Sequence, residues 1–303
     1  MNNDLFVSGH TACAGCGQSL AARLVLNAAG PNTIIVNNTG CLEVFSTKYP
    51  ETAWKVPFIH SLFENAPAVA SGVEAALKVL GTKDTINIIA QGGDGSSIDI
   101  GLQSLSGMLE RGHDILYICY DNEAYMNTGI QRSGSTPFGT NTTTTPLSQN
   151  NYGNPRPKKP MPEIMLAHGI PYVATATVGY PQDLQRKVKK ALSIKGPKYI
   201  QIHVPCPLGW RHESDATLDI AKIAVETGLF PVFEYENGKL ISVRKIQQKP
   251  VVEYLKAQGR FKHLVNNPQE IEKIQVIADT NIQKYGLKAE IVAAVPKTEN
   301  TAQ

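Results

Sequence analysis

The sequence has 303 residues, of which 42% are hydrophobic and 18% charged, and a formal net charge of +3 at pH 7. A chain of this length and composition can bury a large core, as ordinary globular proteins do. The small net charge, without a dense basic run, argues against binding to nucleic acid or to an anionic membrane surface. No apolar run approaches the ~20 residues of a membrane helix, and the first residues lack the pattern of a signal peptide, so we expect a cytoplasmic protein.

The hydrophobic pattern predicts an α/β protein in which helices and apolar strands alternate. Up to residue 120 we expect a helix over 19–29, a strand over 33–37, a helix over 66–80, a strand over 86–90, a helix from near Ser97 and a strand over 115–120. Glu64 and Asn65 precede the second helix and are expected to cap it rather than to line a site. Strand, crossover helix and strand form a βαβ unit of a parallel sheet, which binds ligands beyond the carboxyl ends of its strands.

The composition changes after the last of these strands. Residues 131–160 are rich in Gly, Thr, Asn and Pro, which is typical of a long functional loop, and we expect this loop to close over a cofactor and to contact a partner chain. Further elements are expected as helices over 162–168, 182–194, 215–227 and 267–284, strands over 172–177 and 199–204, and a hairpin around Asn237-Gly238. We therefore predict a main domain over 1–212 and a C-terminal extension over 213–303 that packs on another subunit.

A glycine turn, Gly92-Gly93-Asp94-Gly95, follows the strand over 86–90. Gly93 and Gly95 can take positive φ and let the backbone approach a ligand closely, and the helix after them aims free N–H groups at an anion. Asp94 offers a carboxylate oxygen, and Asn122, at the end of the next strand, offers an amide oxygen; both suit Mg²⁺. Gly-Asp-Gly alone could be only a tight turn. In its strand context, the pair predicts a diphosphate held through magnesium.

Four of the five cysteines lie in expected loops. Cys13 and Cys16 are in a glycine-rich loop, and Cys41 and Cys206 each follow a strand. Clustered cysteines in a reducing compartment indicate metal or redox chemistry, and this Cys₄ set suits either Zn²⁺ or an iron–sulfur cube. Cys119 lies within an apolar strand and is interpreted as a small buried core residue.

Together these motifs resemble a known family, the β subunits of pyruvate:ferredoxin oxidoreductase and its 2-oxoacid relatives. The resemblance covers about residues 8 to 210 and rests on four segments: His10-Thr11-Ala12-Cys13-Ala14-Gly15-Cys16-Gly17, Thr39-Gly40-Cys41-Leu42-Glu43-Val44-Phe45, Gly93-Asp94-Gly95 and Asp121-Asn122-Glu123-Ala124-Tyr125-Met126-Asn127-Thr128-Gly129. It implies a thiamine diphosphate-binding fold with a mostly parallel sheet flanked by helices.

The resemblance also implies the ligands of each cofactor. Cys13, Cys16, Cys41 and Cys206 would hold a [4Fe–4S] cluster, and Asp94, Asn122 and the carbonyl oxygen of Ala124 would bind Mg²⁺. The implied thiamine diphosphate contacts are Gln18, where some relatives carry Glu, and Cys41, Gly93, Asp94, Gly95, Ser96, Asn122, Glu123, Ala124, Tyr125, Met126 and Asn127. Asn127 is the expected catalytic residue, as a hydrogen-bond donor to the reacting substrate.

The implied reaction converts a 2-oxoacid, pyruvate first, with CoA and oxidised ferredoxin into acyl-CoA, CO₂ and reduced ferredoxin. An α subunit would complete the thiamine site, and γ and ferredoxin-like δ subunits would complete the complex, because this sequence lacks a Cys-x₂-Cys-x₂-Cys-x₃-Cys run. Oxalate, 2-oxoisovalerate or phenylglyoxylate remain alternative substrates. Two other classes stay open: a non-redox thiamine carboligase and a non-catalytic electron-transfer subunit.

Overall fold

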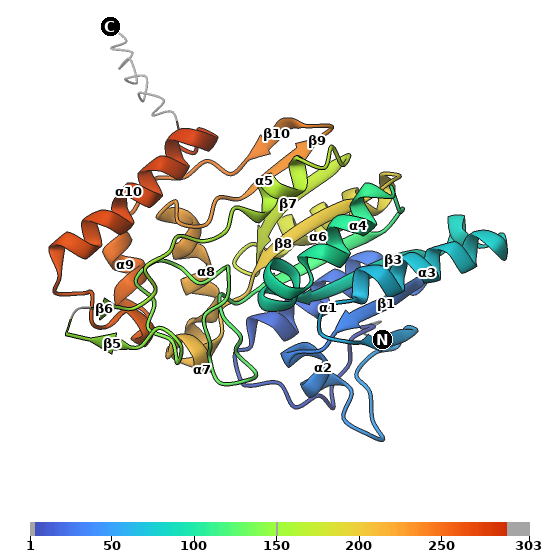
Figure 1. Cartoon of the computed structure of the whole chain (residues 1–303), viewed down its shortest axis with the longest axis horizontal. Helices are drawn as coiled ribbons and strands as arrows, with labels where there is room; N and C mark the ends of the chain where they lie inside the picture. Colours follow the sequence, from blue (N-terminus) through green and yellow to red (C-terminus); the bar gives the residue numbers. More distant parts are fainter. Residues whose placement is uncertain (1–3, 150, 290–303) are drawn as a thin grey trace, which may run out of the picture.

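The computed structural model describes residues 4–149 and 151–289. Within these ranges eight strands form one sheet, in the order β10-β9-β7-β8-β4-β3-β1-β2 (Figure 1). The strands are β1 (Thr33–Asn38), β2 (Phe58–Ser61), β3 (Asn87–Gly93), β4 (Leu116–Asp121), β7 (Tyr172–Thr177), β8 (Lys198–His203), β9 (Phe233–Glu236) and β10 (Lys239–Val243). Neighbouring strands are parallel from β7 to β2, whereas β9 is antiparallel to both β7 and β10. A separate hairpin pairs β5 (Leu147–Ser148) with β6 (Asn151–Tyr152).

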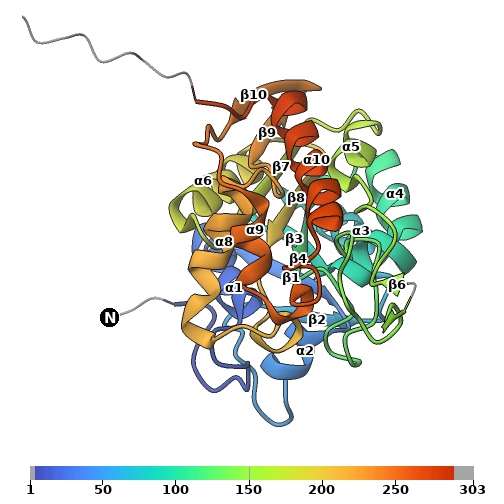
Figure 2. The ribbon, with the colours of Figure 1, turned by 90° about the vertical axis from the view of Figure 1, so that its left-hand side faces the viewer.

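Helices cover both faces of the sheet. α1 (Gly17–Ala29) and α6 (Pro181–Ser193) pack on one face, and α3 (Ala66–Val79), α4 (Leu102–Glu110) and α5 (Met161–Leu166) pack on the other (Figure 2). Successive side chains of β4 enter the two layers in turn, because side chains alternate across a strand. All six residues of β4 are buried, so this strand is covered on both faces.

The segment after β8 forms a third group of elements. It contains α7 (Pro207–Trp210), α8 (Thr217–Glu226), α9 (Val251–Lys256) and α10 (Pro268–Tyr285), together with the edge strands β9 and β10. Their apolar side chains form a hydrophobic cluster of their own around the fully buried Trp210. In Figure 1 α9 and α10, in orange and red, lie at the left of the molecule, and β9 and β10 lie at the top beside β7. The division at residue 212 stays a prediction, and the sheet continues past it through β9.

The predicted fold class is confirmed, and most predicted elements agree with the structure to within one or two residues. The strand over 172–177 has the predicted bounds, and Cys119 is buried in the core as expected. Two elements near the site were not predicted: the edge strand β2 and the short helix α2 (Cys41–Ser46), which begins at the residue expected to open a loop. In the described ranges no helix combines the length and the apolarity that crossing a membrane requires.

The predicted cap of α3 is wrong. Asn65 makes no side-chain capping bond, because its side-chain oxygen accepts a hydrogen bond from Ser61. The backbone N–H of Ala66 is instead bonded at 2.8 Å by Oδ1 of Asn38, which lies at the end of β1. A tertiary contact therefore satisfies the first turn of α3, in place of the local cap that the sequence suggested.

Candidate coenzyme and metal site

A cavity of about 100 Å³ lies where β1, β3 and β4 end at the same edge of the sheet. It is lined by Gln18, Asn37, Asn38, Thr39, Gly40, Cys41, Leu42, Phe63, Gly92, Gly93, Asp94, Gly95, Ser96, Asn122, Ala124, Tyr125, Met126, Asn127 and Thr128. Every residue predicted to contact the coenzyme is among them except Glu123. The cavity lies beyond the carboxyl ends of parallel strands, where ligands of open α/β sheets bind.

Three oxygen-bearing groups converge at the inner end of this cavity. One terminal atom of the Asn122 side-chain amide lies 2.8 Å from Oδ1 of Asp94 and 2.8 Å from the carbonyl oxygen of Ala124. With nitrogen in that place, the amide donates two hydrogen bonds; with oxygen there, a carboxylate, an amide and a carbonyl oxygen face one point. The second arrangement is the hard-oxygen donor set that Mg²⁺ prefers.

Asp94 is almost fully buried, and its surroundings favour a nearby cation. Burial, and then the negative charge of Asp121, raise the pKa of Asp94 well above its usual value. The hydroxyl of Ser133 donates a hydrogen bond to Oδ2 of Asp94, which leaves Oδ1 to face Asn122. A cation bound where these three groups meet would lower the pKa that burial raises, and would keep the Asp94 carboxylate ionised.

Glycine is needed in this turn for a different reason from the predicted one. Neither Gly93 nor Gly95 has positive φ, so the expectation of left-handed glycines here is wrong. A Cβ at Gly95 would lie 2.4 Å from Cε1 of Tyr125, whereas a Cβ at Gly93 would meet nothing closer than the Tyr120 carbonyl oxygen at 4.0 Å. Gly95 is thus required by the packing of a ring, and Gly93 leaves open space in the cavity wall.

The helix after the turn begins earlier than predicted. A π-helical turn, η2 (Gly95–Ile100), starts directly after Asp94, and α4 follows it. The hydroxyls of Ser96 and Ser97 both donate to the carbonyl oxygen of Gly93, at 3.0 and 2.6 Å, and so fix the turn. Such π-helical turns occur frequently at functional sites.

Glu123 is placed behind the cavity. Its backbone has φ of 69°, a left-handed conformation that is unusual for a residue with a side chain. Its carboxylate binds Lys158 at 2.7 Å and Arg260 at 2.5 Å, and these cations hold the pKa of Glu123 to about 2 against the opposing effect of burial. The side chain thus faces away from the cavity, while the neighbours Asn122 and Ala124 line it.

The four cysteines outside the core are all free and lie near one another. Burial raises the pKa of Cys41 to about 12 and that of Cys206 to about 11, and neighbouring thiols add to both shifts: Cys206, Cys16 and Cys13 act on Cys41, and Cys16 and Cys13 act on Cys206. A backbone hydrogen bond connects two of the segments that carry these cysteines. The N–H of Gly17, next to Cys16, donates to the carbonyl oxygen of Pro205, next to Cys206, at 3.2 Å.

Backbone amides face these thiols. The N–H of Gly209 donates to Sγ of Cys206 at 3.4 Å, and the amides of Ser19 and Gln18 bond to the thiol of Cys16. Among the described residues, no three His, Cys, Asp or Glu side chains are close enough together to hold a single metal ion.

Some wall residues were missed by the sequence reasoning. Asn37, Asn38 and Thr39 end β1 and continue beyond it, and polar residues after an apolar strand are a signal that could have revealed them. Ser133, which bonds Asp94 but is not among the wall residues, had no such signal, because it lies 39 positions from Asp94 within a polar loop.

Comparisons with known proteins identify a family and named relatives. Residues 38–202 match the family described as "Thiamine pyrophosphate enzyme, C-terminal TPP binding domain". The chain is 60% identical over 285 residues to pyruvate synthase subunit PorB of Methanosarcina barkeri, covering 93% of this chain and 96% of that protein. It is 52% identical over 277 residues to ketoisovalerate oxidoreductase subunit VorB of Pyrococcus abyssi, covering 89% and 88% of the two chains.

A solved structure has a related fold. The 2-oxoglutarate:ferredoxin oxidoreductase of Magnetococcus marinus, with 2-oxoglutarate, coenzyme A and succinyl-CoA bound, matches with a TM-score of 0.57 at 24% sequence identity, covering 73% of this chain and 81% of that chain. The sheet, the cavity at its edge and the matched segment define a thiamine pyrophosphate-binding domain. The chain belongs to the family of 2-oxoacid:ferredoxin oxidoreductase β subunits that includes the pyruvate and ketoisovalerate enzymes. The family predicted from the motifs is confirmed, and it supports thiamine diphosphate as coenzyme.

Proposed function

We propose that this β subunit binds thiamine diphosphate through Mg²⁺, carries a [4Fe–4S] cluster beside it, and serves an enzyme that converts pyruvate, CoA and two oxidised ferredoxins into acetyl-CoA, CO₂, a proton and two reduced ferredoxins. The observation that carries the proposal is the convergence of Asp94, Asn122 and the Ala124 carbonyl oxygen, with 2.8 Å separations, at the end of the sheet. A hard cation there would anchor a diphosphate that extends past Gly93.

When bound, thiamine diphosphate supplies a nucleophilic carbon for the 2-oxo group and takes up the electron pair released with CO₂. The chain's own part is to hold and orient it. Gly93 and Gly40 leave the cavity wall open, since a Cβ at Gly40 would have no atom within 4 Å. Asn127 lies exposed at the rim, where its amide can donate a hydrogen bond to the substrate. Gln18, from α1, contributes a buried amide to the same wall.

The proposed cluster ligands are Cys13, Cys16, Cys41 and Cys206. A zinc ion binds each thiolate at about 2.3 Å and so draws all four together, whereas each cysteine of a cube binds a separate iron. The coenzyme beside these thiols supports the cube, because removing electrons from the substrate needs a redox-active carrier and zinc has no redox chemistry. Amides that face the sulfurs would stabilise the negative charge of the cluster. A one-electron carrier beside the coenzyme would accept the electrons that pyruvate releases.

The cavity of this chain requires a partner. Val44, Ile59 and Leu62, on α2 and at β2 beside the cavity, are exposed large apolar side chains, which is typical of a surface that another subunit covers. We assign this surface to the α subunit that completes the thiamine site. Further clusters would lie on a ferredoxin-like δ subunit, and a γ subunit would complete the complex. The free cysteines fit the reducing conditions of the cytoplasm.

The substrate is proposed from the relatives. Pyruvate is the first choice because the pyruvate synthase relative has the higher identity, 60% against 52% for the ketoisovalerate relative. A branched 2-oxoacid is the second choice. Nothing in the described cavity favours oxalate or phenylglyoxylate.

The test is turnover of the co-purified complex with a panel of 2-oxoacids, CoA and a viologen acceptor, together with its iron and thiamine content. We expect viologen reduction with pyruvate, bound thiamine, and loss of that thiamine in Asp94→Ala. Faster turnover with 2-oxoisovalerate than with pyruvate would show that 2-oxoisovalerate is the preferred substrate. A complex without iron would restore the carboligase alternative, and one without thiamine would restore the non-catalytic electron-transfer subunit.

A further inference from the structure

The backbone that carries two of the proposed metal ligands is held from the C-terminal extension. Arg260 lies in the turn η4 (Gly259–Phe261) and is almost fully buried. Its Nη2 binds Oε2 of Glu123 at 2.5 Å, across 137 positions of sequence. Its guanidinium carbon lies 3.7 Å from the ring centre of Trp210, and the Trp210 Nε1–H donates to the Asn122 carbonyl oxygen at 2.8 Å. The Arg260 side chain therefore contacts Glu123 directly and Asn122 through Trp210.

These contacts hold Glu123 in a backbone conformation that is unfavourable by itself. Glu123 has φ of 69°, and a left-handed residue with a side chain persists only where its surroundings determine it. The turn of the chain at Glu123 lets Asn122 and Ala124, on either side of it, face Asp94 together. Three further hydrogen bonds act at this residue. Thr136 donates to its carbonyl oxygen at 2.7 Å, Lys158 donates to its carboxylate at 2.7 Å, and its own backbone N–H donates to Oδ1 of Asp121 at 3.1 Å.

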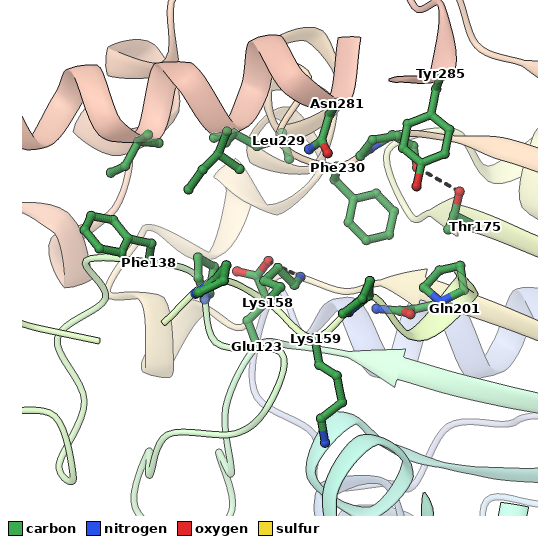
Figure 3. Close-up of a pocket in the computed structure, with 18 of the residues that line it drawn as sticks. Glu123, Phe138, Lys158, Lys159, Thr175, Gln201, Leu229, Phe230, Asn281 and Tyr285 are labelled. Atoms are coloured by element: carbon green, nitrogen blue, oxygen red, sulfur yellow. Dashed lines mark hydrogen bonds and ion pairs between the residues drawn. The ribbon is translucent and has the colours of Figure 1, made fainter. Parts of the chain in front are cut away.

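Lys158 and Arg260 both pair with Glu123, but their other contacts differ. Lys158 is shared between Glu123 and Asp121, at 2.7 and 2.9 Å, so it neutralises charge without reaching Asn122. Figure 3 shows Glu123 and Lys158 together on one wall of a cavity of about 260 Å³, opposite Leu229, Asn281 and Tyr285 of the C-terminal extension. Of these two cations, Arg260 both forms an ion pair with Glu123 and stacks on the ring of Trp210. The planar guanidinium group allows both contacts at once, whereas a lysine ammonium group does not.

We propose that Arg260 is a positioning residue for the metal site: through Glu123 and Trp210 it fixes the backbone from Asn122 to Ala124, so that the C-terminal extension sets the affinity for the coenzyme. This rests on the proposed function, because it concerns the same Mg²⁺ and diphosphate. Groups that orient metal ligands typically change metal affinity by about 10- to 100-fold when they are removed.

The test compares Arg260→Lys and Arg260→Met with Arg244→Met in the purified complex. Arg244 is a matched control, because it also lies in the extension and stacks on an aromatic ring, Tyr180, at 3.4 Å, and it is exposed and outside the cavity wall. Thiamine retained after gel filtration and the half-saturating Mg²⁺ and thiamine diphosphate concentrations are measured. We expect the half-saturating concentrations to rise roughly 10- to 100-fold in Arg260→Met, by less in Arg260→Lys, and not at all in Arg244→Met.

A double variant separates positioning from stability. Arg260→Met removes one of the cations that pair with the buried Glu123 and therefore lowers stability by itself. Glu123→Gln/Arg260→Met removes one charge of each sign and leaves Lys158 paired with Asp121. We expect it to recover thermal stability while coenzyme retention stays low. Recovery of both properties, or wild-type retention in Arg260→Met and Arg260→Lys, would overturn the inference. Wild-type complex that itself lacks thiamine would instead overturn the proposed function.

Discussion

Gly93→Ala separates the requirements of the fold from those of the coenzyme. The added Cβ would lie 4.0 Å from the nearest atom beyond the two adjacent residues, the Tyr120 carbonyl oxygen, and the backbone at Gly93 does not have positive φ. A Gly→Ala change in a compatible conformation stabilises a protein by about 0.4–1 kcal/mol, so the fold should be unaffected or slightly more stable. The methyl group would occupy the cavity beside Asp94, where we place the diphosphate.

The expected effect on binding is large. A displacement of about 1 Å in a positioned group can change rates by on the order of 100-fold, and each tenfold change in affinity is about 1.4 kcal/mol. We therefore expect the half-saturating thiamine diphosphate concentration to rise by roughly 10- to 100-fold, measured by turnover and by the thiamine retained after gel filtration. Gly72→Ala is the matched control, because Gly72 lies exposed in α3 with no atom within 4 Å of an added Cβ. Equal coenzyme retention in both variants would refute the placement of the diphosphate.

Three further predictions follow from the same site. Asp94→Asn removes a buried charge whose pKa burial already raises, so the complex should remain folded while thiamine is lost; unchanged thiamine content would count against Asp94 as a metal ligand. Gly95→Ala should lower the thermal midpoint of the complex, because its Cβ would lie 2.4 Å from the Tyr125 ring, and Gly95→Ala/Tyr125→Leu should recover part of that loss. His203 is fully buried, has no hydrogen-bond partner on either ring nitrogen among the described residues, and has a pKa that burial lowers to about 4. Below about pH 6.5 the unfolded chain takes up a proton on this residue and the folded chain does not. The free energy of unfolding therefore decreases as the pH is lowered, by about 2 kcal/mol from pH 7 to pH 5. Denaturation of His203→Phe at both pH values should show a smaller fall, and an identical fall would contradict a neutral buried histidine.

The sequence predicted those parts of the fold whose signal is local. The apolar runs of β4 and β7 are long enough to identify buried strands, and the site residues Asn122 and Ala124 directly follow the end of β4. β2 was missed because Phe58–Ser61 is a short edge strand with two exposed residues in its middle, so it lacks an apolar run.

The contacts that hold the site could not be predicted, because they join distant segments. Arg260 meets Glu123 across 137 positions, and Ser133 meets Asp94 across 39, and neither pair belongs to a local pattern. The turn glycines were predicted as site residues for the wrong conformational reason: Gly95 is needed for the close approach of Tyr125, which only the folded chain shows.

We propose above that the coenzyme and an iron–sulfur cluster share one edge of the sheet. The most direct test of this proposal is low-temperature electron paramagnetic resonance, with iron analysis, of the anaerobically purified complex before and after addition of pyruvate. The variants are Cys41→Ser and Cys206→Ser, with Cys119→Ser, a thiol buried in the core, as control. We expect pyruvate to reduce a cluster in the wild type and the control. Each of the other variants should lose about four iron atoms per β subunit, the content of one cube, together with that signal. Unchanged iron and an unchanged pyruvate-dependent signal in Cys41→Ser and Cys206→Ser would contradict the proposal.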